Sequence, residues 1–241
     1  MGISHYLAMT DGEIADADAL PKHLAYMACH FSPYTTGLTQ PPQLPPQAML
    51  ILNDRIPFCG HDYEQIANQL ASRVEKLQLR CLLLDFQRPD TPAELVKHLV
   101  ASSPLPIGVS AAFADNLPCA VFLPPVPPDV SPEEHIKPWT GREIWLDAAV
   151  EALQITVDTE GSRRQTISSQ TSRDLPFRDD TLCCRYKTQI LPDRAIFTLQ
   201  RTPEDLQQLL AGAAPLGVTT AVSLYQEIIT TGRAGGMHRP P

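Results

Sequence analysis

Short runs of consecutive apolar residues recur along the chain, and they are the main structural signal in the sequence. Eight such runs are rich in β-forming residues, and most of them are apolar on successive positions, which is typical of strands covered on both faces. They span residues 25–31, 49–54, 80–86, 106–112, 120–125, 143–149, 195–200 and 218–225. Strands of this kind belong to parallel sheets packed against helices, so we expect an α/β fold.

Helical periodicity separates only some of these strands. Residues 62–77 place their apolar side chains on one stripe, and Asp62 stands where a helix is capped. Residues 91–101 and 202–216 each open with Thr-Pro, which favours a helix start. The order of elements predicts a (β/α)₈ TIM-like barrel with several helices reduced or missing. An open doubly wound sheet is the alternative, but no G-x-G-x-x-G motif follows the first strand.

The remaining segments fit a single barrel domain over residues 1–241. Residues 1–20 carry four acidic side chains and no apolar stretch, so we expect an N-terminal extension that is not a signal peptide. Residues 153–168 alternate around Thr-Glu-Gly-Ser, which predicts an inserted β-hairpin. Residues 230–241 are rich in glycine and end in a proline pair, which is typical of a flexible tail.

Composition excludes several classes of function. The formal net charge is −8 and lysines and arginines do not cluster, so a nucleic-acid-binding protein is not expected. No segment approaches the length of a membrane span. The six cysteines include no C-x-x-C pair, which argues against a structural zinc site and fits a reduced, cytoplasmic protein without a cofactor.

Polar side chains follow several of the predicted strands, at the end where a parallel barrel opens. The active sites of such barrels lie at the carboxyl ends of the strands, so these residues are the candidates for binding and catalysis. They are His30, Asn53, Asp54, Arg55, Asp85, Gln87, Asp147 and Tyr225. Trp139 lies in a proline-rich connection and is the candidate for stacking on a sugar ring. Each also has a structural explanation, such as an ion pair between Asp54 and a neighbouring arginine.

Residues 80–87, Arg-Cys-Leu-Leu-Leu-Asp-Phe-Gln, can be compared with a known motif. The segment resembles the fourth strand of family 18 glycoside hydrolases, the chitinase-like barrels, whose motif is D-x-x-D-x-D-x-E. Alignment of the last positions places Asp85 on the final aspartate of the motif and Gln87 on its catalytic glutamate. The two earlier aspartates are replaced by Leu83 and Arg80. The resemblance implies a barrel that binds a glycan, or another small ligand, at its mouth.

The glutamine changes what the resemblance implies about chemistry. In family 18 the glutamate protonates the leaving oxygen while the acetamido group of the substrate attacks, held by the neighbouring aspartate. A glutamine has no dissociable proton, so Gln87 cannot act as a general acid. The chain is therefore expected to be a glycan-binding protein with lost catalysis, or a hydrolase whose acid lies on another strand. Asp54 and Asp147 are the first candidates for that acid, beside Asp85.

Two other functions stay open on the sequence alone. A non-enzymatic interaction protein on a barrel scaffold would use the proline-rich connections and the hairpin at 153–168 as its partner surface. A metal-dependent hydrolase would gather His30, Asp54, His61 and Asp85 around a divalent ion. Barrels of that kind normally carry His-x-His on the first strand, and this chain has Cys29 and Phe31 beside His30. No metal site is therefore expected.

Overall fold

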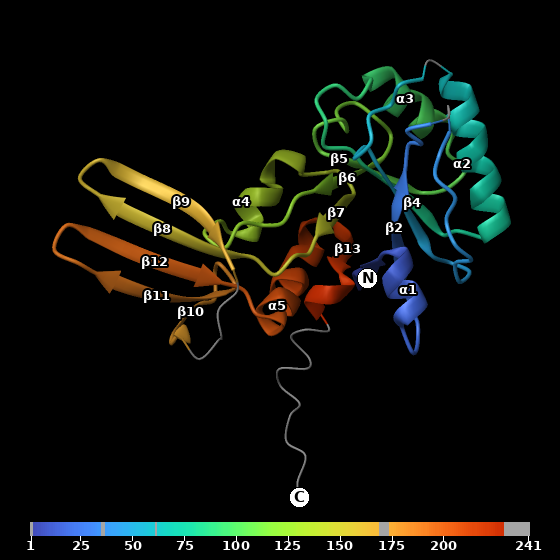
Figure 1. The fold of residues 1–241 in the computed structure, drawn as a ribbon. Helices are drawn as coiled ribbons and strands as arrows, with labels where there is room; N and C mark the ends of the chain where they lie inside the picture. The colour runs from blue at the N-terminus through green and yellow to red at the C-terminus, as the bar shows by residue number, and fades with distance from the viewer. Residues whose placement is uncertain (1, 35–36, 61, 169–173, 229–241) are drawn as a thin grey trace, which may run out of the picture.

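The computed structural model describes residues 2–34, 37–60, 62–168 and 174–228. Its core is a closed barrel of eight parallel strands in the order β1-β13-β7-β6-β5-β4-β3-β2, which confirms the predicted TIM-like fold (Figure 1). The strands are β1 (Ser4–Met9), β2 (Leu24–His30), β3 (Met49–Asn53), β4 (Cys81–Asp85), β5 (Ile107–Ser110), β6 (Ala120–Leu123), β7 (Ile144–Asp147) and β13 (Val218–Leu224).

The first barrel strand lies where the sequence predicted an extension. Ser4–Met9 pairs in parallel with β13 on one side and with β2 on the other, and so it closes the barrel. Its half-polar pattern, which includes Ser4 and His5, hid it from a search for continuous apolar runs. With β1 in place, Cys81–Asp85 is the fourth strand of the barrel. That is the position to which the family 18 resemblance assigns it.

Among the described residues, only three helices are long enough to pack along the outside of the barrel, so helices cover only part of it. They are α2 (Tyr63–Leu77), α3 (Ala93–Ser102) and α5 (Pro203–Ala213), with short turns α1 (Asp11–Asp16), α4 (Pro132–Ile136), η1 (Lys137–Trp139) and η3 (Ala214–Leu216). The α2 helix begins as predicted, because the side chain of Asp62 accepts a hydrogen bond from the Gln65 amide at 2.8 Å. Residues 111–119 connect β5 to β6 without a helix. The expectation of reduced or missing helices is thus confirmed.

Below the carboxyl ends of the strands, side chains from alternate strand positions fill the interior of the barrel. Trp145 on β7 is 2% exposed and packs in the same interior cluster as Leu83 and Ile51. Its ring lies against Gly108 on β5, where an added Cβ atom would come within 2.3 Å of Trp145 Cε3. The absence of a side chain at Gly108 therefore makes the space that Trp145 occupies.

The connection between β7 and α5 forms a separate antiparallel sheet that projects from one side of the barrel (Figure 1). Its strands are β8 (Ala152–Asp158), β9 (Gly161–Ile167), β10 (Phe177–Asp179), β11 (Cys184–Ile190) and β12 (Arg194–Gln200), in the order β10-β11-β12-β8-β9. The predicted hairpin at 153–168 is present as β8 and β9. The predicted barrel strand at 195–200 is wrong, because it pairs with β8 and β11 in this sheet.

A buried arginine ties the inserted sheet to the barrel. Arg201 follows β12, is 1% exposed, and donates hydrogen bonds to the carbonyl oxygens of Pro127 at 3.1 Å and Leu182 at 3.0 Å. Pro127 belongs to the loop after β6, and Leu182 lies between β10 and β11. The guanidinium therefore fixes the base of the sheet to a loop at the carboxyl end of the barrel strands.

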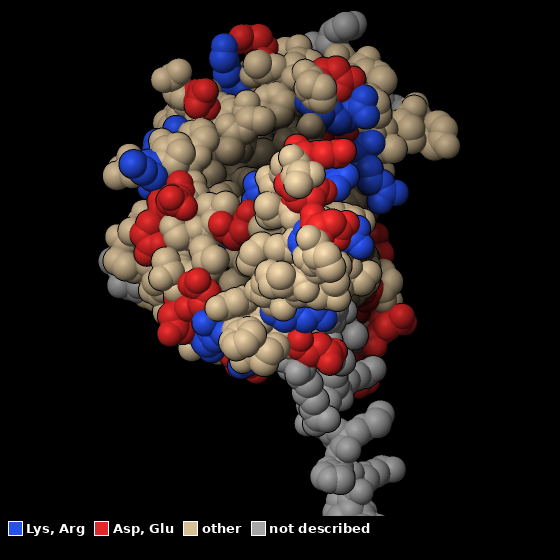
Figure 2. Space-filling model, turned by 90° about the vertical axis from the view of Figure 1, so that its left-hand side faces the viewer, with Lys and Arg blue, Asp and Glu red and all other residues tan. Residues whose placement is uncertain are grey.

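On the face drawn in Figure 2, basic side chains are scattered among acidic ones. Within the described part of the chain, no helix has the length and apolar character needed to cross a membrane. The predicted tail at 230–241 lies outside the described residues.

Candidate active site

A cavity of about 760 Å³ opens at the carboxyl ends of the barrel strands. The alternation of side chains explains which residues face it. Ile51, Leu83 and Trp145 point into the barrel, so the residue two positions later on each strand points the same way at the mouth. The cavity brings together most of the predicted site residues: His30, Asn53, Asp54, Arg55, Asp85, Gln87 and Asp147.

Asp85 and Gln87 form a hydrogen-bonded pair at the end of β4. The side-chain amide of Gln87 donates to Asp85 Oδ1 at 2.7 Å, and the Ser110 hydroxyl lies 3.3 Å from the same oxygen. The glutamine thus takes the position beside the aspartate that the resemblance gives to a catalytic glutamate. Its N–H bond carries no acidic proton, so the pair can bind and orient a ligand but cannot protonate a leaving group.

Asp54 holds the loop that carries Gln87. It is 2% exposed and accepts hydrogen bonds from the backbone amides of Gln87 and Arg88, both at 2.9 Å, and from the Thr91 hydroxyl at 2.6 Å. Arg88 makes its ion pair with Asp90 instead, at 2.9 Å. With its oxygens committed to these donors, Asp54 fits a positioning role and not the role of relocated acid that the sequence suggested.

The carboxyl group of Asp147, at the mouth of the barrel, has a strongly raised pKa. Asp147 ends β7, which lies four strands from β3 in either direction and therefore across the barrel from it. Burial raises the pKa of Asp147 from 3.8 to about 7, and repulsion from Asp85, Glu227 and Glu151 adds to the effect. Near neutral pH this carboxyl group therefore exchanges a proton, which is what a general acid requires.

The rim on the β2 and β3 side is built from polar side chains in fixed orientations. His30 Nδ1 lies 2.8 Å from the carbonyl oxygen of Phe31 and must donate to it, which leaves Nε2 for a ligand. The Asn53 amide donates to the carbonyl oxygen of Met27 at 2.9 Å, and its oxygen accepts from the Arg55 amide at 3.2 Å. The Arg55 side chain is exposed at this edge.

Two predicted binding residues are not among those that line the cavity. Trp139 lies in η1, ahead of β7, and so belongs to the amino end of the barrel strands. Its ring packs in part against the main core. Tyr225 follows β13 directly and also packs against that core, while Leu224 lines the cavity in its place. The structure does not bring either ring to the mouth.

The sequence analysis missed the contribution of β1 and its following turn. Thr10 and Asp11 line the cavity, and the Asp11 carboxylate accepts a hydrogen bond from the hydroxyl of Tyr26 at 3.0 Å. A signal for this turn exists in the sequence, because Thr10 and Glu13 have the spacing of a capping box and form one.

Among the described residues no cluster of His, Cys, Asp and Glu has the geometry of a metal site. His61 lies outside them.

Comparison with known proteins finds similarity in structure and not in sequence. No model of a protein family matches the chain, and no curated protein matches it. The spore cortex-lytic enzyme SleL of Bacillus cereus matches with a TM-score of 0.57 and 11% identity, over 92% of this chain and 70% of that chain. A chitinase from Chromobacterium violaceum matches with a TM-score of 0.57 and 8% identity, over 99% and 100% of the two chains.

The SleL enzyme of Bacillus megaterium matches to a similar degree, with a TM-score of 0.56 and 10% identity over 96% of this chain and 73% of that chain. The chain shares their barrel fold. At these levels of identity the likeness concerns the fold, and the activity of this chain has to be argued from its own residues.

Proposed function

We propose that this protein is a glycoside hydrolase of altered design, in which Asp147 on β7 replaces the missing acid at Gln87. The observation that carries the proposal is a carboxyl group that holds its proton near neutral pH and faces Asp85 in the same cavity. The shared fold with a chitinase and two spore cortex-lytic enzymes supports a polysaccharide as ligand. The family 18 resemblance of residues 80–87 narrows this to a polymer of acetamido sugars.

The chemistry follows from the two carboxyl groups. Asp147 donates its proton to the glycosidic oxygen as the bond between that oxygen and the anomeric carbon breaks. The acetamido oxygen of the substrate forms the new bond to the anomeric carbon, and a side-chain oxygen of Asp85 accepts a hydrogen bond from the acetamido N–H. Water then attacks the anomeric carbon, the bond between that carbon and the acetamido oxygen breaks so that the acetamido group is restored, and the Asp147 carboxylate takes up the proton that water releases. The Gln87 side-chain carbonyl oxygen can accept a hydrogen bond from a sugar hydroxyl.

Hydrolysis of N-acetylglucosamine oligomers tests this assignment. Asp147→Asn should abolish turnover while oligomer binding persists, because an amide cannot donate the proton. The wild-type rate should fall as pH rises above about 7, where Asp147 loses its proton. Asp115→Asn, at an exposed turn outside the cavity, is the matched control and should retain activity. A fully active Asp147→Asn enzyme would exclude Asp147 as the acid.

The amide at Gln87 also favours a second candidate, a glycan-binding protein without turnover. The pair of Gln87 and Asp85 then serves only to orient sugar hydroxyls. This alternative predicts that wild type binds the oligomers and that neither wild type nor Asp147→Asn releases product. Binding of the intact oligomer, measured calorimetrically alongside product release, separates the two candidates.

A further inference from the structure

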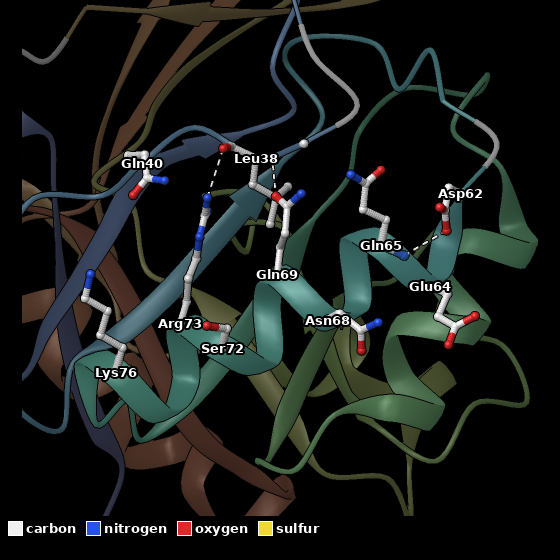
Figure 3. A pocket seen from close by; sticks show the side chains of 11 residues that line it. Leu38, Gln40, Asp62, Glu64, Gln65, Asn68, Gln69, Ser72, Arg73 and Lys76 are labelled. Atoms are coloured by element: carbon white, nitrogen blue, oxygen red, sulfur yellow. Dashed lines mark hydrogen bonds between the residues drawn. The ribbon is translucent and has the colours of Figure 1, made fainter.

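A second hollow of about 820 Å³ lies on the outer side of α2 (Figure 3). One wall is the polar face of the helix, and the other is the chain segment 37–40, which follows β2. Asn68, Ser72 and Lys76 repeat along α2 at intervals of four residues, which is close to one helical turn, so they form a row. Among the described residues, none of these three side chains has a hydrogen-bond or ion-pair partner.

The segment 37–40 is held rigidly between the helix and the barrel. Gln69 accepts a hydrogen bond from the Leu38 amide at 3.0 Å, and Arg73 donates to the Leu38 carbonyl oxygen at 2.9 Å (Figure 3). On its other side, the Thr39 amide donates to the carbonyl oxygen of His30 at 2.9 Å. Both backbone groups of Leu38 and the amide of Thr39 are therefore fixed, so the wall of the hollow is preorganised.

The same segment separates the hollow from the mouth of the barrel. Gly37 and Leu38 line the hollow, Thr39 lines the mouth, and Gln40 lines both. Gln40 therefore lies at the edge of both cavities, and a chain molecule that leaves the mouth past Gln40 reaches the hollow along α2. Such continuity suits a polymer better than a small molecule.

We propose that the hollow on α2 binds the part of a polysaccharide chain that extends beyond the mouth. The inference rests on the proposed function and adds the path of the polymer to it. Amide, hydroxyl and ammonium groups form hydrogen bonds with sugar hydroxyls. Their spacing along α2 offers one hydrogen-bonding partner after another to successive sugars of the chain. The carbohydrate is an uncharged or weakly charged polymer, because the hollow combines Glu64 and Asp62 with Lys76 and Arg73.

Chain-length dependence of binding tests the proposal. Wild type should bind the hexamer of N-acetylglucosamine more tightly than the dimer, because only the hexamer is long enough to leave the mouth. The double variant Asn68→Ala/Ser72→Ala should weaken hexamer binding about fivefold, the effect of losing two modest hydrogen bonds, and leave dimer binding unchanged. Alanine favours the helix, so the variant should fold. Glu75→Ala, exposed on the same helix outside the hollow, is the control.

The outcomes separate this inference from the function on which it rests. Equal affinity of wild type for dimer and hexamer overturns the path along α2 but leaves the site at the mouth intact. Unchanged hexamer binding by the double variant does the same. Failure of wild type to bind either oligomer overturns the proposed acetamido-sugar ligand, and the inference with it. The proposed ligand and the path along α2 are both supported if the double variant loses affinity for the hexamer and not for the dimer, and Glu75→Ala loses neither.

Discussion

The substitution Asp147→Asn should change the pH dependence of stability in a direction that the structure fixes. In the folded protein the pKa of Asp147 is raised from 3.8 to about 7, whereas the unfolded chain exposes the carboxyl group to water. The folded state therefore binds the proton more tightly than the unfolded state does. This group stabilises the fold fully only below about pH 3.8, and the contribution is lost as pH rises through 7.

The size of the effect follows from the difference in pKa. At about 1.4 kcal/mol for each pH unit, the whole shift corresponds to about 4 kcal/mol. Between pH 5 and pH 8, ionisation of Asp147 should lower the free energy of unfolding of wild type by about 3 kcal/mol. Asparagine cannot ionise, so the advantage of Asp147→Asn over wild type should grow by that amount across the same interval.

Urea denaturation at pH 5, 6, 7 and 8 measures this difference, with unfolding followed by tryptophan fluorescence. Asp85→Asn provides a second test, because it removes one of the repulsive charges and should shift the loss of stability to lower pH. Asp115→Asn should reproduce the wild-type pH dependence. If the advantage of Asp147→Asn is the same at pH 5 and pH 8, Asp147 is not protonated in the folded protein and the proposed acid is wrong.

Further predictions concern the positioning carboxylate, the barrel interior and the aligned glutamine. Asp54→Ala should lower the free energy of unfolding by about 3–5 kcal/mol in urea denaturation, because two amides and a hydroxyl lose their acceptor. Gly108→Ala should cost about 2 kcal/mol or more through its clash with Trp145, whereas Gly212→Ala in α5, with open space around it, should gain about 0.5–1 kcal/mol in thermal unfolding. Gln87→Glu places a dissociable proton beside Asp85 and should raise hydrolysis of acetamido-sugar substrates; no gain in a folded variant would contradict the alignment with family 18.

The sequence predicted the barrel because most of its strands are continuous apolar runs. It failed at two strands for opposite reasons. Ser4–Met9 begins with the polar residues Ser4 and His5 and was passed over, although it is a barrel strand. Ala195–Gln200 looks apolar enough for a barrel, but its pairing in register with β8 and β11 depends on residues far along the chain. Local patterns do not contain that information.

The sequence predicted the position of a site residue well only where a barrel strand by itself fixes that position. Asp85 and Asp147 end strands whose inward positions alternate, so strand ends alone are enough to place them at the mouth. The sequence could not show that Asp147 is a better candidate for the general acid than Asp54, because that choice depends on burial and on hydrogen-bond donors that the fold supplies. Trp139 was proposed because it is an aromatic residue in a connection between two strands. The sequence of a connection does not indicate at which end of the barrel a given residue lies.

The contact between Gly108 and Trp145 has a consequence for how this sequence can evolve. Any side chain at position 108 needs the space that the indole ring occupies, so the two positions can change only together or in a fixed order. A smaller residue at 145 has to come first, and it leaves a void until position 108 grows to fill it. Homologous sequences should therefore show glycine at 108 wherever tryptophan stands at 145, and the pair should covary although 36 positions separate them along the chain.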